Sequence, residues 1–560
     1  MRVRTMLVSV IAVLSLIGVI CMTARGEAPA ASAPAIEANT LYEITFTAKP
    51  VGNPFHDATC QAEFTSPSGK KIAVGGFYYG SEEFRIRFVP REQGTWTWTA
   101  ELTGQGETSA SSVEPRQEKS GGFVCSGVSG HGFLQVSKRN PYRLEYDDGT
   151  AFYPIGIQTC SFLGPDFAGE PGQSREGWTD NKTWLKAFAG SVNLVRTQFG
   201  QGTTAGCALP LIPGGGDGTV YDTDLAAKID QAYAQHRAVG ISQMLILFQD
   251  MSLWGSRPTA FGHGRDLAGY KSVEAPNLPL QEQYIRYIVA RWGAFVDVWE
   301  LYNEDSYSPD DYLAHLAKVV RAADPYGHLV TSTYWRKSFT WSDIVTWHEY
   351  MGMPASGVDS QVVSQLAQFK SYGKPVVNTE FGNQGILSNV DPLKWRIATW
   401  TAFMNEGSIL FWSASNRQLK VGENAGKGNA NAYIGPDTRQ HLRVLNEFTR
   451  DLPIDMRPVS AGYTHNHGDI RAYALSNGAA TVVYVHHFSD RAKAHQVAPL
   501  LVETGPGEFR YRWINPEDGK EVASGELMSL QQYASLKVPP VTVDLACRID
   551  RVEATSKPAP

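Results

Sequence analysis

The stretch Val296-Asp-Val-Trp-Glu-Leu-Tyr-Asn303-Glu304 decides how the rest of this 560-residue chain is interpreted. It is a short apolar run, rich in β-branched and aromatic residues, and it ends in a glutamate; such runs are typical of strands. The stretch Pro375-Val-Val-Asn-Thr-Glu380-Phe-Gly382 has the same character and also carries a glutamate at its end. Both lie in a region, beginning after Ala151, where apolar runs alternate with helical patterns. This alternation predicts an α/β fold.

Eight such runs occur in this region, and amphipathic helical patterns lie between most of them. The runs are Phe152–Ile157, Val192–Gln198, Ser242–Phe248, Phe295–Tyr302, Leu329–Tyr334, Ile344–Trp347, Pro375–Thr379 and Ile409–Trp412. The helical patterns are Asp224–Ala238, Leu280–Trp292, Pro309–Ala323, Asp359–Tyr372 and Pro392–Asn405. Eight β/α units over about 280 residues match the size of a (β/α)8 TIM barrel. About nine residues separate the fifth run from the sixth, which leaves no room for a full helix there.

The segments on either side of this region have a different pattern, with short alternating runs broken by Gly, Pro and Asn. Thr95-Trp-Thr-Trp-Thr-Ala is one example in the N-terminal segment, and a period of two with frequent turns predicts an antiparallel β-sandwich. In the C-terminal segment, the turn Asn515-Pro-Glu-Asp-Gly closes a predicted hairpin. We expect an N-terminal immunoglobulin-like sandwich at 41–126, the barrel at 127–453 and a second sandwich at 454–552. A hairpin with the turn Asp147-Asp-Gly is expected at the start of the barrel segment.

The N-terminus has the pattern of an export signal. Arg2 and Arg4 precede an apolar run from Met6 to Met22, and small and polar residues follow. We interpret residues 1–26 as a cleaved signal peptide and 27–40 as a linker, which places the protein outside the cell, in the periplasm or at the cell surface. An uncleaved anchoring helix is the alternative, because the apolar run is close to the lower limit for spanning a bilayer. After cleavage no membrane span is expected.

Composition and charge exclude several classes of protein. The 50 Lys and Arg against 56 Asp and Glu give a net charge of −6, with no basic stretch, so nucleic acid is not an expected ligand. No CxxC or ordered His/Cys set indicates zinc, and we expect no metal and no cofactor. Removal of Cys21 with the signal leaves an odd number of cysteines, of which Cys60 and Cys125 could pair.

In a TIM barrel the reactive groups lie at the carboxyl ends of the strands. Glu304 and Glu380 end the fourth and seventh runs, and these two strands lie on opposing sides of the barrel mouth. Two facing carboxylates are what glycosidic bond cleavage requires: one protonates the leaving oxygen, and the other attacks the anomeric carbon or activates water. Glu300 has the same strand parity as Glu304 but lies deeper, so we expect it to pair with Arg196 inside the barrel.

These residues resemble a known group of enzymes, the clan A glycoside hydrolases that include the cellulase-like and β-mannanase-like family 5. The resemblance rests on Asn303-Glu304, Glu380-Phe-Gly, His348-Glu-Tyr350, Asn193-Leu-Val-Arg196 and Trp412, and it covers the barrel. The pattern from Phe88 to Trp96 resembles the DUF5060-type domain that precedes such barrels in bacterial enzymes. The turn from Trp513 to Gly519 resembles that of a small C-terminal sandwich.

The resemblance implies a retaining mechanism, with Glu304 as acid/base and Glu380 as nucleophile. It further implies that Asn303 contacts the sugar 2-hydroxyl, that His348 and Tyr350 position substrate and nucleophile, and that Arg196 holds Glu380 ionised. Trp412, at the end of the eighth run, is the best candidate for stacking on a sugar. Four further tryptophans could also stack on sugar faces: Trp254, Trp335, Trp341 and Trp347. The expected partner is a polysaccharide or oligosaccharide, and the low positive charge fits a neutral glycan.

Two long loops, Gly200–Tyr221 and Asp250–Pro276, are expected to shape the subsites. The glycine-rich part of the first could instead bind calcium, although it lacks alternating carboxylates. A serine hydrolase is excluded because Gly127-Val-Ser-Gly-His-Gly has the wrong spacing for a nucleophile elbow. The remaining alternative to a hydrolase is a cell-surface carbohydrate-binding or adhesion protein built on an inactive barrel.

Overall fold

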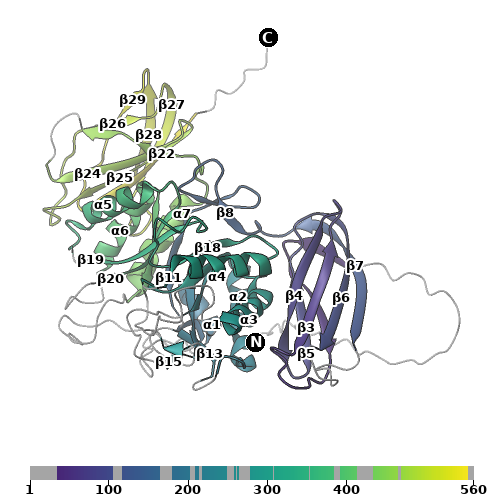
Figure 1. The fold of residues 1–560 in the computed structure, drawn as a ribbon. Coiled ribbons are helices and arrows are strands. Elements are labelled where there is room, and N and C mark those ends of the chain that lie inside the picture. The colour runs from purple at the N-terminus through teal and green to yellow at the C-terminus, as the bar shows by residue number, and fades with distance from the viewer. Residues whose placement is uncertain are drawn as a thin grey trace, which may run out of the picture.

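The computed structural model of the protein is a parallel barrel with an all-β unit on either side (Figure 1). It describes residues 34–104, 116–159, 161–163, 180–201, 208–213, 217–248, 258–259, 262–263, 278–306, 308–351, 353–383, 391–412, 433–463 and 468–552. The expected signal peptide lies outside these residues. None of the helices within them is long and apolar enough to cross a membrane.

The eight barrel strands run parallel in the order β18-β17-β14-β12-β11-β21-β20-β19. Their bounds are β11 Ile155–Gln158, β12 Leu194–Gln201, β14 Ser242–Phe248, β17 Val298–Tyr302, β18 Leu329–Thr331, β19 Val345–Met351, β20 Val376–Asn383 and β21 Gly407–Trp412. β13 (Ala208–Ile212) pairs with the end of β12. Two backbone hydrogen bonds, Asp343 N–H to the Val330 carbonyl and Trp335 N–H to the Thr346 carbonyl, link the β18 and β19 sides. The predicted barrel is therefore confirmed.

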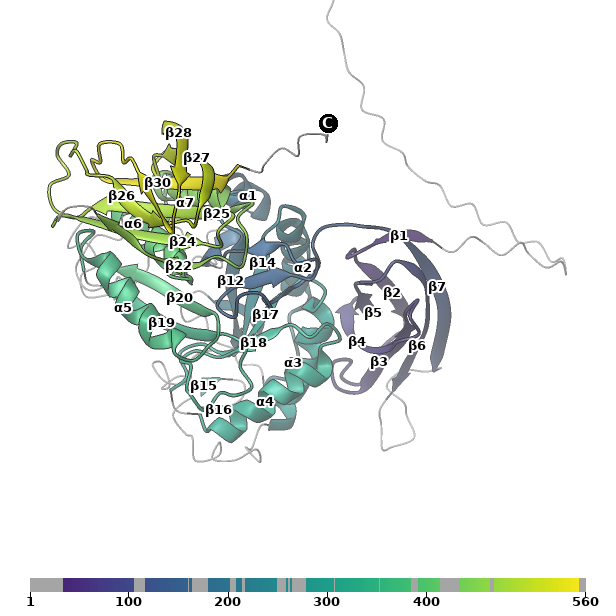
Figure 2. The same ribbon diagram turned by 90° about the horizontal axis from the view of Figure 1, so that it is seen from above.

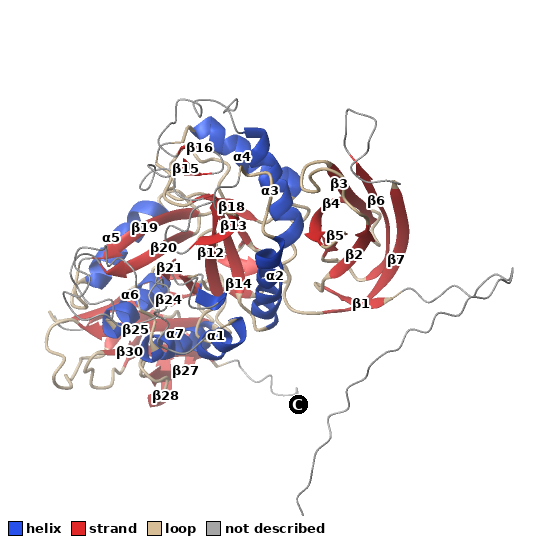
Figure 3. Cartoon of the chain, turned by 90° about the horizontal axis from the view of Figure 1, so that it is seen from below, coloured by secondary structure: helices blue, strands red, loops and turns tan. Residues whose placement is uncertain are grey.

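Each predicted run contributes a barrel strand, although the ends of several strands differ. In the first run only the part from Ile155 onward joins the barrel, because Ala151–Phe152 forms β10 of a separate sheet. The helices are α1 Asn181–Phe188, α2 Thr223–Ala238, α3 Leu278–Trp292, α4 Asp310–Ala323, α5 Val358–Lys370, α6 Pro392–Met404 and α7 Pro436–Thr449, with a 3-10 turn at Ser161–Leu163. No helix lies between β18 and β19, as the short spacing predicts. Figure 3 shows α2 and α3 between the barrel strands and the N-terminal unit.

A small three-stranded sheet closes the amino end of the barrel. It comprises β8 (Leu134–Val136), β9 (Leu144–Tyr146) and β10, and it contains the hairpin that the sequence predicts. Its apolar side chains form one buried cluster with residues at the starts of the barrel strands: Leu134, Leu144, Phe152, Leu194, Met244, Val298, Leu329, Val377 and Leu410. This end of the barrel is packed with side chains, so the polar groups gather at the carboxyl end.

The N-terminal unit is a seven-stranded sheet, in the order β1-β7-β6-β3-β4-β5-β2, that folds over its own core (Figure 2). The strands are β1 Ala35–Ala38, β2 Tyr42–Thr47, β3 Ala58–Thr65, β4 Lys71–Gly80, β5 Glu83–Phe88, β6 Gly94–Gly104 and β7 Gln117–Val128. Tyr42 of β2 and Phe123 of β7 meet with ring centroids 4.4 Å apart, which shows that the two ends of the sheet face each other.

The structure differs from the sequence-based expectation at two points of this unit. Ala35–Ala38, expected within the linker, pairs with β7 as a parallel strand. A four-residue strand carries too little pattern to be recognised against the Ala- and Pro-rich segment before it. Cys60 and Cys125 do not pair: both are buried free thiols, as is Cys547. Cys60 lies on β3 and Cys125 on β7, and β6 separates these two strands.

The C-terminal unit is the second predicted sandwich. Its six-stranded sheet has the order β22-β24-β25-β30-β27-β28, and its three-stranded sheet has the order β23-β26-β29. The strands are β22 Arg457–Val459, β23 Ala461–Tyr463, β24 Ile470–Ser476, β25 Ala480–His487, β26 Leu500–Glu503, β27 Gly507–Ile514, β28 Glu521–Ser529, β29 Tyr533–Leu536 and β30 Asp544–Arg551. The predicted turn at Asn515 joins β27 to β28.

Buried ion pairs attach both flanking units to the barrel. On the N-terminal side, the Arg87 guanidinium of β5 lies 2.9 Å from the Asp230 carboxylate of α2. On the C-terminal side, Arg396 of α6 contacts Asp544 of β30 at 2.9 Å, and His486 of β25 contacts Asp359 of α5 at 2.8 Å. His486 thus lies on a buried face of β25. These contacts hold the barrel helices from two sides.

Candidate active site

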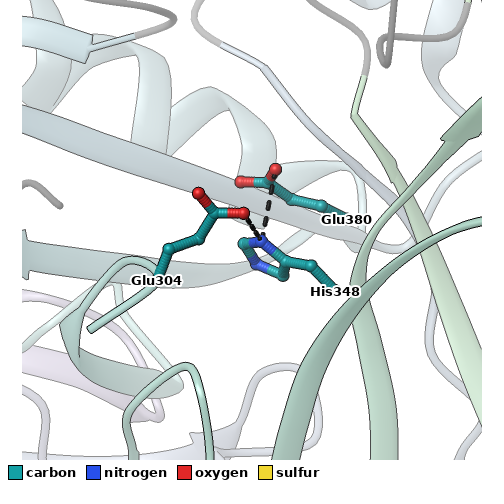
Figure 4. Close-up of side chains that lie close together, drawn as sticks. All are labelled: Glu304, His348 and Glu380. Atoms are coloured by element: carbon teal, nitrogen blue, oxygen red, sulfur yellow. Dashed lines mark hydrogen bonds and ion pairs between the residues drawn. The ribbon is translucent and has the colours of Figure 1, made fainter. Parts of the chain in front are cut away.

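Three side chains from three barrel strands converge at the carboxyl end of the barrel. Figure 4 shows Glu304, His348 and Glu380 pointing toward one another. Glu304 follows β17, His348 lies in β19 and Glu380 lies in β20. All three side chains are at least nine-tenths buried. The structure thus brings together the two glutamates that the sequence analysis selected.

Local backbone irregularities aim both glutamates into the mouth. Glu304 has a φ of 50°, in the left-handed region that is uncommon for residues other than glycine. In β20 the register slips: Trp347 of β19 pairs with Asn378, but the next residue, His348, pairs with Glu380. Thr379 is therefore the extra residue of a β-bulge, a feature that redirects a side chain next to active sites. Such strained or bulged positions persist where the surrounding structure determines them.

Arg196 of β12 lies beneath the two carboxylates and is fully buried. Its guanidinium is 2.6 Å from Glu300 and 2.9 Å from Glu380, so the predicted pair with Glu300 is confirmed. It also donates to the Asn303 side-chain oxygen at 2.8 Å. That bond orients the Asn303 amide so that its NH2 group is directed away from Arg196. One cation therefore positions the side chains of Glu300 in β17, Asn303 directly after β17 and Glu380 in β20.

His348 bridges the two glutamates. Its Nδ1 lies 2.7 Å from the Glu304 carboxylate and 3.4 Å from the Glu380 carboxylate. Burial lowers the pKa of His348 to about 4, so at neutral pH the ring is uncharged. A neutral ring with its proton on Nδ1 donates to a carboxylate, which fixes the tautomer.

Two tyrosine hydroxyls complete the contacts of the carboxylates. Tyr350 of β19 donates to Glu380, and Tyr334, which follows β18, donates to Glu304 at 3.0 Å. Burial raises the pKa of Tyr350 far above its ordinary value, and the neighbouring Glu380 carboxylate raises it further. Tyr350 therefore keeps its proton and acts as a donor.

The pKa values of Glu304 and Glu380 are shifted in the same direction, but the two carboxylates have different stabilising contacts. Burial raises the pKa of both carboxyls. For Glu380, the neighbouring Glu304 carboxylate raises the pKa further, whereas the Arg196 guanidinium and the hydrogen bond from Tyr350 oppose the rise. The expected contact of Arg196 with Glu380 is thus present, but burial outweighs its effect. Of the two, Glu380 has the direct contact with the cation, at 2.9 Å.

The same three residues could also hold a metal ion. One ligand atom from each of Glu304, His348 and Glu380 lies within 4.8 Å of the other two, and no other such group occurs among the described residues. The Arg196 guanidinium beside Glu380 already supplies positive charge here, and it would repel a cation placed between the carboxylates. We therefore interpret the group as a proton-handling pair of carboxylates.

The tryptophans divide into one at the mouth and three that are structural. Trp412 ends β21, is half-buried, and its ring centroid lies 6.1 Å from that of Tyr350. The expectation that three others stack on sugars is wrong, because each packs on an aromatic ring of the protein: Trp335 on Tyr372, Trp341 on Phe339 and Trp347 on Phe369. Trp254, Asp250–Pro276 apart from two short strands, and residues 202–207 and 214–216 of the first loop lie outside the described residues.

Two residues at the mouth were not selected from the sequence. Tyr334 is the last residue of the fifth apolar run, so the rule that selects strand-end residues would have included it. Gln158 ends β11 and is 2% exposed, and its register partners are Arg196 and Trp412. Its side-chain oxygen has no hydrogen-bond partner among the described residues. Strand-end position would therefore have identified Tyr334, whereas an isolated glutamine carries no chemical signature that would identify Gln158.

Comparisons with known proteins agree with this architecture. Residues 36–103 match the family model of a domain of unknown function, DUF5060. No curated protein is similar enough in sequence to count as a match. The chain is similar in structure to a candidate glycoside hydrolase from Bacteroides vulgatus ATCC 8482, with a TM-score of 0.64 and 18% identity over 93% of this chain and 100% of the other. A family 5 glycoside hydrolase of the same organism has a TM-score of 0.52 and 14% identity, over 76% of this chain and 94% of its own. At these identities the likeness shows the fold.

Replacing Arg196 with methionine tests the central role of this cation. The change leaves Glu300 and Glu380 buried without an arginine, which we expect to lower the free energy of unfolding at pH 7 by about 3–5 kcal/mol. The loss should be smaller at pH 5. Removing the cation raises the folded-state pKa of Glu380 further above its unfolded value, so the variant loses stability as pH rises.

Urea unfolding of both proteins at the two pH values measures this difference. Arg286→Met is the matched control, because its partner Glu282 lies on the helix surface and such pairs contribute about 0–1 kcal/mol. Equal destabilisation of the Arg196 variant at pH 5 and pH 7 would contradict the electrostatic explanation.

Proposed function

We propose that this chain is an exported retaining glycoside hydrolase that cleaves O-glycosidic bonds in a polysaccharide or oligosaccharide by double displacement. The observation that carries the proposal is the pair of buried carboxylates, Glu304 and Glu380, held face to face at the carboxyl end of the barrel. The fold that the chain shares with glycoside hydrolases of Bacteroides vulgatus supports it. So does the sequence pattern at these strand ends.

The separation of the carboxylates favours retention over inversion. An oxygen of Glu304 and an oxygen of Glu380 lie within 4.8 Å of each other. Retaining enzymes place their two carboxyl groups about 5–5.5 Å apart, whereas inverting enzymes need about 6.5–9.5 Å to admit a water molecule between sugar and base. A pair this close leaves no room for that water, so direct attack by one carboxylate is the better fit.

The contacts of each carboxylate support a division of roles. Glu380, beside Arg196 and Tyr350, is stabilised as an anion and suits attack on the anomeric carbon. Glu304, whose pKa burial raises, suits donation of a proton to the leaving oxygen as the glycosidic bond breaks. In the second half of the reaction Glu304 takes a proton from water, whose oxygen attacks the anomeric carbon and releases Glu380.

Neighbouring groups are suited to hold a sugar at this point. Asn303 has its side-chain oxygen on Arg196, so its NH2 group can donate to the sugar 2-hydroxyl. Trp412 offers a half-buried indole at the mouth for stacking on a sugar face. The net charge of −6 favours a neutral glycan over an acidic one. The signal-like N-terminus supports export to the cell surface, periplasm or medium.

Substitution of either glutamate provides the first test. We expect Glu380→Ala to lower hydrolysis of a cleavable glycan by about 10⁴-fold or more while leaving binding intact, because the nucleophile is lost but the sugar contacts remain.

Glu304→Ala should regain activity with azide on aryl glycosides, since such leaving groups need little protonation. Glu349→Ala is the control, because this glutamate is adjacent to His348 but contacts Gln361 of α5.

Screening a panel of plant and algal polysaccharides identifies the substrate. Reducing-sugar assays then measure hydrolysis, and calorimetry measures binding. Binding without turnover by the wild-type protein would instead favour the non-catalytic carbohydrate-binding alternative. Full activity of Glu380→Ala would overturn the assignment of the nucleophile.

The anomer formed first is a second expected outcome. Double displacement conserves the configuration of the anomeric carbon, so the initial product should have the same anomeric form as the bond cleaved. Proton NMR of the reaction in its first minutes, before mutarotation, measures this directly. An inverted first product would show that Glu380 activates water.

Removal of metal ions separates the proposed chemistry from a metal-dependent one. Because two carboxylates and their protons carry every step, we expect activity to be unchanged after dialysis against EDTA. The measurement compares initial rates before dialysis, after dialysis, and after addition of Zn²⁺, Mn²⁺ or Ca²⁺. Loss of activity that one of these ions restores would favour a metal held by Glu304, His348 and Glu380.

A further inference from the structure

The connection between β18 and β19 carries a tyrosine that contacts the Glu304 carboxylate. This connection, residues 332–344, is the part of the barrel that lacks a helix. The connection starts at the mouth and returns toward the start of β19, where Asp343 N–H donates to the Val330 carbonyl at 2.9 Å. Tyr334 is the third residue of this connection, and its hydroxyl donates to the Glu304 carboxylate at 3.0 Å.

The backbone on both sides of Tyr334 is anchored to the neighbouring strands. Before it, the Thr333 carbonyl accepts from Asp305 N–H at 2.6 Å, and the Thr333 hydroxyl donates to Glu300 at 2.7 Å. After it, Trp335 N–H donates to the Thr346 carbonyl at 3.1 Å. Tyr334 is thus held between two fixed points rather than projecting from a free loop.

More distant contacts fix the rest of the connection. The Trp335 ring packs on Tyr372 with centroids 4.5 Å apart. Arg336 contacts Asp310 of α4 at 2.8 Å and donates to the Ser308 carbonyl at 2.8 Å. These contacts join the connection to α4 and to the end of α5, so the tyrosine hydroxyl is positioned before any substrate binds.

The hydroxyl acts on one particular oxygen. Tyr334 and His348 both contact Oε1 of Glu304, at 3.0 and 2.7 Å. The two rings pack edge to face with centroids 5.6 Å apart, so their donors approach this oxygen from adjacent directions. Two donors on one oxygen fix the rotation of the carboxyl group about its Cγ–Cδ bond.

We propose that Tyr334 is a positioning residue that orients the Glu304 carboxyl and sets the pH at which it gives up its proton. This inference rests on the proposed function of Glu304 as the acid/base. A hydroxyl that donates to a carboxylate stabilises the ionised form, so Tyr334 counteracts the effect of burial on the acidity of Glu304. The connection without a helix is therefore the element that adjusts the general acid.

Replacing Tyr334 with phenylalanine removes the hydroxyl and keeps the ring. The pKa of Glu304 should rise by about 1, because one hydrogen bond to a charged group corresponds to roughly that shift. It is measured by carbon-13 NMR titration of protein labelled at the glutamate carboxyl carbon, with the Glu304 signal assigned by its loss in Glu304→Gln. Tyr372→Phe is the matched control, since it deletes a tyrosine hydroxyl packed behind the same connection. In the control the Glu304 titration should match the wild type.

Kinetics supply an independent measurement. For an active enzyme, the alkaline limb of the plot of kcat/KM against pH should shift to higher pH in Tyr334→Phe, by the same number of pH units as the pKa of Glu304 in the titration. The rate loss should be larger with 4-methylumbelliferyl than with 2,4-dinitrophenyl glycosides of the sugar released from the natural glycan, because the second leaving group needs no acid.

These measurements separate the two proposals. An unchanged Glu304 titration in a folded Tyr334→Phe protein, judged by its circular dichroism and Tm, would overturn the inference about Tyr334 and leave the glycosidase proposal standing. Absence of hydrolysis by the wild-type protein on any glycan would overturn the proposed function. The titration would still report whether Tyr334 sets the acidity of Glu304.

Discussion

The fully buried guanidinium of Arg196 is the interaction on which the arrangement of this site depends. An arginine with no exposed surface must find acceptors inside the protein, since an unpaired buried charge is strongly destabilising. Here they are supplied by Glu300 of β17, Asn303 directly after β17 and Glu380 of β20. The cation therefore ties the second, fourth and seventh barrel strands together directly below the two carboxylates. It also provides positive charge where a nucleophilic carboxylate would need it.

Around this cation the site is assembled from irregular backbone within a regular barrel. The positive φ of Glu304, the bulge at Thr379 and the connection that carries Tyr334 each direct one polar group into the mouth. The remainder of the molecule is arranged to hold such features in place. The small sheet of β8, β9 and β10 fills the opposite end of the barrel, and ion pairs attach the flanking sandwiches to α2, α5 and α6. Rigid surroundings of this kind are what strained positions require.

Sequence reasoning succeeded where a pattern spans many residues. All eight apolar runs form barrel strands, and the depth of Glu300 within its strand correctly predicted its pair with Arg196. Sequence reasoning failed where the role of a residue depends on which neighbours its side chain contacts in the fold. Trp335 follows a strand, as a sugar platform would, yet it packs on Tyr372. Four residues at Ala35–Ala38 are too few for a pattern, and only the adjacent edge of β7 makes them a strand.

By itself the sequence determined the α/β barrel, the flanking β units and the two glutamates at strand ends, because hydrophobic periodicity and strand-end position are local properties of the chain. The tertiary structure decided how those glutamates meet. The register slip at Thr379 turns Glu380 inward, although strict alternation from Val377 would direct it outward. The bridge through His348 and the approach of Tyr334 join strands four, five, six and seven. Such contacts depend on strand register and barrel closure, which no local stretch of sequence specifies.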